Sequence, residues 1–188
     1  MKRIVIFASG SGTNAENLIK FFHNRENASV IQVLSNNPYA KVLERAKKLK
    51  VSALSFNKIA LSQTDDVLNI LKASNPDLIV LAGFLWKFPG NILNEFPNKV
   101  INVHPALLPK YGGKGMYGMN VHKAVVANKE SETGITIHYV NEHYDEGAVI
   151  FQAKCDVNAS DTAEDVAAKI HELEMAHFPK VVESLLKK

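Results

Sequence analysis

The stretch Ile4-Val-Ile-Phe-Ala-Ser-Gly-Ser-Gly-Thr-Asn14 decides the fold of this 188-residue chain. Its first five residues are an apolar, β-branched run, which predicts a buried strand. Ser9–Asn14 follows without a spacer and contains two glycines, which allow the backbone to turn tightly. Apolar residues at helical spacing in 18–22 then predict a helix over 14–23. A strand, a glycine turn and a helix in this order predict the start of a βαβ unit.

The same alternation continues through the first hundred residues. Apolar runs at 30–35, 78–82 and 100–103 predict further buried strands, and helical patterns at 40–49 and 64–71 lie between them. Strands that alternate with helices predict a parallel sheet.

The pattern changes after Pro105. A glycine-rich loop at 112–118 leads to a predicted helix near 121–127 and then to two strands, 134–140 and 148–157. A short turn-like segment joins these strands, so we expect an antiparallel or mixed edge on the sheet.

A long helix is expected to close the chain. Asp161 and Glu164 have the spacing of a capping box at its start, and Pro179 should bend or interrupt it. Together the elements predict one domain over residues 1–188. We expect an α/β, Rossmann-like fold of three layers, with a mostly parallel central sheet and an antiparallel edge.

Composition narrows the class of protein. A hydrophobic content of 46% suffices for a core, and the net charge of +3 is scattered, so nucleic acid is not indicated. The single cysteine, Cys155, fits a reducing compartment. The apolar run 4–8 is too short for a signal peptide or a membrane span. We expect a cytoplasmic protein, either a monomer or a homodimer, that does not act at a membrane.

The loop Ser9–Asn14 is the first candidate site. Amides at the start of a helix bind anions, and glycines let a phosphate approach the backbone, although a plain tight turn would need the same residues. A dinucleotide site would require an acidic residue at the end of the second strand, where Ser35-Asn-Asn37 stands instead. A Walker A lysine is also missing. A monophosphate is therefore favoured.

Asn102 and His104 form the second candidate, at the carboxyl end of a predicted parallel strand. Strand side chains alternate, so both should project to one side and could act on a single oxygen. Residues 143–147 form the third candidate, a polar loop that could bring the Asp145 carboxylate to the same cleft. Taken alone, a structural role near Pro105 explains the first pair equally well, and a solvated hairpin explains the loop better.

The remaining histidines do not indicate a metal site. His171 and His177 are six residues apart on a predicted helix and cannot share one face. His138 and His143 lack a suitably spaced cysteine or carboxylate. We expect no metal.

Five segments together resemble the folate-dependent formyltransferase family and, within it, the phosphoribosylglycinamide formyltransferases: Ser9–Asn14, Leu81–Phe84, Asn102–Tyr111, Gly134–His138 and Tyr144–Gly147. The resemblance covers nearly the whole chain. It implies an enzyme that transfers a formyl group from 10-formyltetrahydrofolate to the amine of 5′-phosphoribosylglycinamide in de novo purine (IMP) biosynthesis.

The resemblance also implies roles for single residues. Asn102, His104 and Asp145 would be catalytic. Asn102 and His104 would donate hydrogen bonds to the oxyanion that forms when the amine attacks the formyl carbon. Asp145 would keep His104 protonated, through water. The substrate would contact Ser11, Gly12, Thr13, Asn14 and Glu174. Folate would contact Leu85, Trp86, Lys87, Phe88, Asn102, Glu142, His143, Tyr144 and Asp145. Residues 1–100 would form a phosphate-binding half, and residues 101–188 a catalytic and folate-binding half.

This sequence departs from the family pattern in two places. Trp86 stands where many relatives have a basic residue, and the loop 110–119 is longer and richer in glycine than usual.

A formyl-folate hydrolase, a nucleotide-sugar formyltransferase or an initiator-tRNA formyltransferase would share the chemistry. A non-catalytic phosphate- or folate-binding module is the rival from another class.

Overall fold

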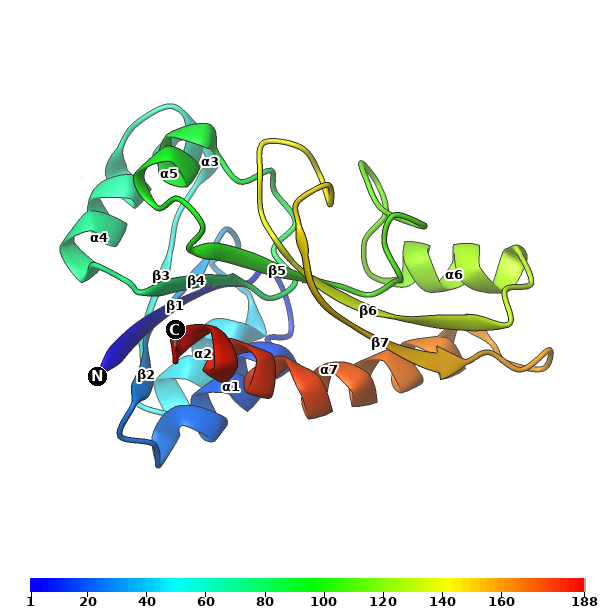
Figure 1. The fold of residues 1–188 in the computed structure, drawn as a ribbon. Coiled ribbons are helices and arrows are strands. Elements are labelled where there is room, and N and C mark those ends of the chain that lie inside the picture. Colours follow the sequence, from blue (N-terminus) through cyan, green and yellow to red (C-terminus); the bar gives the residue numbers. More distant parts are fainter. Residues whose placement is uncertain (188) are drawn as a thin grey trace.

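The computed structural model describes residues 1–187, and within them seven strands form one sheet in the order β3-β2-β1-β4-β5-β6-β7 (Figure 1). The strands are β1 (Lys2–Phe7), β2 (Ala28–Ser35), β3 (Ser52–Ser55), β4 (Leu78–Leu81), β5 (Val100–His104), β6 (Glu132–Tyr139) and β7 (Val149–Asp156). The first five strands run parallel, whereas β6 is antiparallel to β5 and β7 is antiparallel to β6. The predicted parallel sheet with an antiparallel edge is confirmed.

Helices cover both faces of the sheet, which gives the three predicted layers (Figure 1). The helices are α1 (Thr13–His23), α2 (Lys41–Lys48), α3 (Lys58–Ser62), α4 (Asp66–Ser74), α5 (Gly90–Glu95), α6 (Met119–Ala127) and α7 (Ala163–Leu186). One face packs against α1, α2 and α7, and the other against α3, α4 and α5. Within residues 1–187, no helix combines the length and the apolar character that crossing a bilayer requires.

Strand β1 shows why its sequence is apolar without a break. Ile4 and Ile6 belong to the core beneath α1 and α7, whereas Val5 and Phe7 belong to the core beneath α4 and α5. All four side chains are fully buried. A strand that is covered on both faces needs apolar residues at every position.

Three short elements were not predicted: β3, α3 and α5. Strand β3 is an edge strand of four mostly exposed residues, so it lacks an apolar run. Helices α3 and α5 have five and six residues, too few for a helical period to show.

The start of α7 corrects the predicted capping box. The box lies one residue later, at Thr162 and Asp165, where each side chain accepts a hydrogen bond from the other's backbone amide. Asp161 instead accepts from the amide of Asn158 and pairs with Lys169. Of the two predicted effects of Pro179, a bend or an interruption, the interruption does not occur, because α7 continues through this buried proline to Leu186.

The strand order reverses between β1 and β4. Both strands are parallel neighbours in the sheet, and β1 continues into α1 on one face while β4 leads towards α5 on the other (Figure 1). The connections therefore diverge and leave an opening at the carboxyl ends of the strands.

Replacing Thr162 should weaken α7. Thr162→Ala removes the hydroxyl that accepts from the Asp165 amide, so we expect the free energy of unfolding to fall by about 1 kcal/mol. Urea unfolding monitored by circular dichroism measures this change. Ser160→Ala is the control, since its exposed hydroxyl makes no hydrogen bond among residues 1–187. An equal loss in both variants would contradict the assignment of the cap.

Candidate active site

A cavity of about 450 Å³ lies at the carboxyl ends of β1, β4 and β5. Its lining brings together segments that are distant in the sequence: Ser11–Asn14, Ala82–Leu85, Asn102–Pro105, Gly113–Gly118, Tyr144, Asp145 and Glu174. A second cavity of about 410 Å³ adjoins it, because Leu85 and Tyr144 line both. The first cavity therefore gathers the predicted catalytic and phosphate-binding residues.

The loop at the start of α1 leaves the helix amides open to the first cavity. Gly12 is the residue that precedes α1, and no side chain within residues 1–187 caps the helix. Its φ of 77° is left-handed, and a Cβ atom there would lie 2.8 Å from the Cα atom of Val42. Packing against α2 thus requires glycine at this position, in addition to any need for ligand approach.

Glu174 of α7 reaches this loop. Its carboxylate accepts a hydrogen bond from Asn14 Nδ2 at 2.8 Å, whereas the Asn14 Oδ1 atom is buried without a partner among the described residues. Burial raises the pKa of Glu174, and the bond from Asn14 opposes this shift. The Glu174 carboxyl group and the unpaired Asn14 Oδ1 atom therefore lie beside the helix amides that we expect to bind phosphate.

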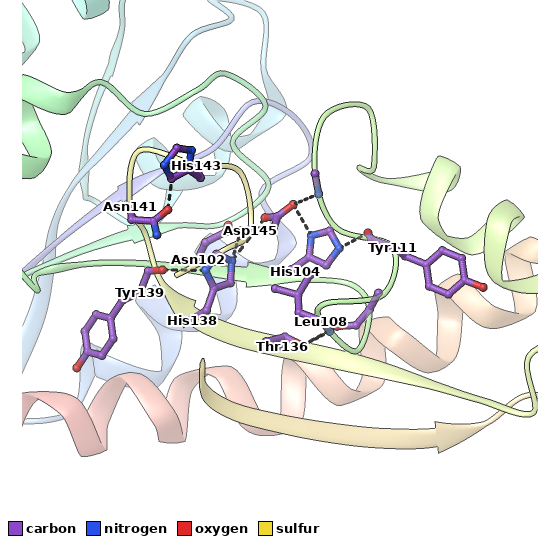
Figure 2. Close-up of polar contacts among 12 residues, drawn as sticks. Asn102, His104, Leu108, Tyr111, Thr136, His138, Tyr139, Asn141, His143 and Asp145 are labelled. Carbon is purple, nitrogen blue, oxygen red and sulfur yellow. Dashed lines mark hydrogen bonds and ion pairs between the residues drawn. The ribbon is translucent and has the colours of Figure 1, made fainter. Parts of the chain in front are cut away.

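His104 lies between two acceptors (Figure 2). Its Nε2 atom is 2.7 Å from the carbonyl oxygen of Tyr111 and must carry a proton to bond there. Its Nδ1 atom is 3.5 Å from Asp145 Oδ2, too close for the water that we expected between them.

Burial and the neighbouring charges shift the pKa values of His104 and Asp145 in opposite directions. Burial lowers the pKa of His104 below its usual value, although the Asp145 charge and the bond to Tyr111 raise it. For Asp145, burial raises the pKa, but the interactions with His138, His104 and the Gly113 amide outweigh it and leave the pKa lowered. Asp145 is therefore the ionised member of the pair at neutral pH.

The backbone around Asp145 is held in an uncommon conformation. Its φ of 58° is left-handed, a region that few residues other than glycine and asparagine or aspartate adopt. Its Oδ2 atom accepts a hydrogen bond from the amide of Gly113 at 3.0 Å. The carboxylate thus joins the 141–147 loop to the glycine-rich loop beside His104.

His138 orients the amide of Asn102. The register of β5 and β6 places these two residues opposite each other. Nδ1 of His138 lies 2.9 Å from the Tyr139 carbonyl oxygen, and its Nε2 lies 3.2 Å from Asn102 Nδ2 and 3.6 Å from Asp145 Oδ1. The second N–H of this amide remains for a ligand.

The turn after His104 is fixed by one buried hydroxyl (Figure 2). Thr136 Oγ1 donates to the Ala106 carbonyl at 2.7 Å and accepts from the amide of Leu108 and from Gln152. The turn therefore has a defined position relative to β6 and β7.

Most of the predicted folate contacts surround the second cavity. Leu85–Phe88, Glu142 and Tyr144 line it, together with Lys58, Leu61 and Ser62 of α3. Phe88 contributes little surface, since it is buried in the core beside Phe7. His143 lines neither cavity as residues 1–187 form them, and its exposed side chain lies at the loop tip (Figure 2).

Sequence reasoning missed three groups of residues at the site. Thr136 and His138 were given no role at the site, although they are alternate polar residues in an apolar strand, which signals a shared polar face. His122 is buried in the first cavity, and its Nδ1 lacks a partner among the described residues. No sequence pattern distinguishes it within α6. The α3 residues were missed with their helix.

Comparison with known proteins identifies similar chains. Residues 2–182 match the family described as formyl transferase. Phosphoribosylglycinamide formyltransferase from Bacillus subtilis is 33% identical over 193 residues, covering 99% of this chain and 95% of that protein. The chloroplastic enzyme of the same name from Arabidopsis thaliana is 33% identical over 96% of this chain, which spans 64% of that protein. Glycinamide ribonucleotide transformylase 1 from Symbiobacterium toebii superposes with a TM-score of 0.90 at 30% identity, covering 100% of this chain and 88% of that structure.

Removing the charge of Asp145 should lower the pKa of His104 further. The Asp145 carboxylate favours the imidazolium and so raises the pKa of His104. In Asp145→Asn this effect is lost, while burial still lowers the pKa. The His104 ring signals in an NMR titration measure the shift. Glu146→Gln removes a neighbouring exposed charge and should leave this pKa unchanged. An unchanged or higher pKa in Asp145→Asn would show that the carboxylate does not act on His104.

Proposed function

Because the chain belongs to the formyl transferase family, we propose that it transfers the formyl group of 10-formyltetrahydrofolate to the amine of 5′-phosphoribosylglycinamide, a step of de novo purine (IMP) synthesis. One observation carries the proposal. A single cavity brings the open amides of Gly12–Asn14 together with Asn102, His104 and Asp145, and it continues into a second cavity with aromatic walls.

The reaction forms a C–N bond between the substrate amine and the formyl carbon, and then breaks the C–N bond to folate. The tetrahedral intermediate carries an oxyanion, which the free N–H of Asn102 stabilises. His104 contributes a second donor when its Nε2–H leaves the Tyr111 carbonyl and donates a hydrogen bond to the oxyanion instead. The proton that the amine loses passes to His104, whose imidazolium the Asp145 carboxylate stabilises, and it finally reaches the folate nitrogen.

The phosphate of the substrate binds to the backbone amides at the start of α1, where the helix dipole also favours an anion. Ser11, Gly12, Thr13 and Asn14 supply this subsite. Glu174, whose carboxylate is held by the bond from Asn14, can accept a hydrogen bond from a ribose hydroxyl.

The folate co-substrate extends from the first cavity into the second. Trp86 packs edge-on against Phe56 and Phe84, so it offers a rigid aromatic wall. Lys58 and Lys87 supply positive charge for the carboxylates of folate in place of a basic residue at position 86. In this scheme, residues 1–100 contribute the phosphate loop and residues 101–188 the catalytic trio. The single cysteine supports a cytoplasmic location.

Turnover should require an amine that carries a monophosphate. Purified protein with 10-formyltetrahydrofolate should form deformylated folate with phosphoribosylglycinamide, but not with water alone or with an amino-sugar nucleotide. Inorganic phosphate should compete with phosphoribosylglycinamide and not with folate, because it binds to the α1 amides. Chloride at equal ionic strength is the control. Equal turnover without an amine would indicate a hydrolase instead.

Replacing His104 should abolish most turnover. His104→Ala and His104→Gln both remove the imidazole, so kcat should fall about 10²-fold or more. Glutamine can still donate to the Tyr111 carbonyl, so its thermal unfolding should stay near that of the native protein. The exposed His23→Ala is the control. Near-normal kcat in either His104 variant would refute the catalytic role.

A further inference from the structure

The loop that joins β1 to α1 is held by α2. The amide of Val42 donates to the carbonyl oxygen of Gly10 at 3.1 Å, and Arg45 Nε donates to the carbonyl oxygen of Ser11 at 2.9 Å. In a trans peptide, the C=O of one residue and the N–H of the next point in opposite directions. The amides of Ser11 and Gly12 therefore point away from α2.

The guanidinium of Arg45 also pairs with Glu16 in the first turn of α1. Lys20 binds the same carboxylate at 2.6 Å. The bond from Lys20 lowers the pKa of Glu16, burial opposes this, and Arg45 adds to the lowering, so Glu16 is ionised at neutral pH. An acidic side chain stabilises this end of the helix but repels a phosphate bound to the same end.

Arg45 itself does not line the substrate cavity as residues 1–187 form it. It is half-buried and borders a separate surface hollow between α1 and α2. Any effect on the phosphate must therefore pass through the loop backbone and through Glu16.

We propose that Arg45 is a positioning residue for the substrate phosphate, which aims the Gly12 amide at the cavity and neutralises Glu16. One guanidinium performs both tasks because its fork reaches the Ser11 carbonyl and the Glu16 carboxylate together. The inference rests on the phosphate subsite proposed above and adds to it a residue that the substrate never touches.

Two substitutions distinguish the hydrogen bond from Arg45 to the Ser11 carbonyl from the positive charge of Arg45 beside Glu16. Arg45→Met removes both, so KM for phosphoribosylglycinamide should rise about tenfold, with kcat and KM for folate within about twofold of native. Arg45→Lys keeps the charge but cannot bond to both partners, so this KM should stay raised about threefold or more. Full recovery in Arg45→Lys would overturn the orienting role.

A phosphate-free substrate distinguishes positioning from general damage. With glycinamide riboside, native protein and Arg45→Met should show the same KM, because Arg45 acts only through the phosphate. Lys47→Met removes one charge from an exposed site on the same helix, and its KM for phosphoribosylglycinamide should match the native value. An equal rise in KM for the riboside, or in Lys47→Met, would overturn the proposal.

Binding of ribose 5-phosphate, followed by NMR titration, tests the proposal without turnover. Weaker binding to Arg45→Met than to native protein supports the proposal even if no formyl transfer occurs, in which case only the proposed function fails. Equal binding to both proteins overturns the role of Arg45 and leaves the function standing. No binding to native protein overturns the phosphate subsite and the role of Arg45 with it.

Discussion

The reversal of strand order between β1 and β4 is the constraint on which the site depends. Chain segments leaving the two strands separate to opposite faces of the sheet, so the carboxyl ends of β1 and β4 are left open to ligands. The α1 amides border this opening on one side and the loop after β4 borders it on the other. Strand β5 then brings His104 to the same edge. The two adjoining cavities at this edge therefore contain helix amides, an imidazole and an aromatic wall.

The antiparallel edge has a different task from the parallel strands. Strand β6 pairs with β5, so His138 orients Asn102 and Thr136 fixes the turn that follows His104. The connection from β6 to β7 returns Asp145 to the cavity. Strand β5 thus presents Asn102 and His104 to the cavity, and β6 fixes their surroundings through hydrogen bonds.

The sequence predicted those parts of the fold that produce a period or a motif. Strand β1 was predictable because burial on both faces demands an unbroken apolar run. The turn at Ser9–Asn14 was predictable because its two glycines allow the backbone to turn tightly before a helix. Strand β3 was not, since an exposed edge strand has no apolar signature. At the site, the positions of Asn102 and His104 followed from strand alternation. The contact of Asp145 with Gly113 depends on two loops meeting in space, which no local pattern encodes.

The position of Glu174 on the last helix has a consequence for how the chain matures during synthesis. A nascent chain that has emerged only through β5 contains the five parallel strands and the loop at the start of α1. At that stage His104 lacks its carboxylate neighbour, and Asn14 lacks Glu174. A ligand that contacts both the loop at the start of α1 and Glu174 stabilises the state in which α7 is docked against α1.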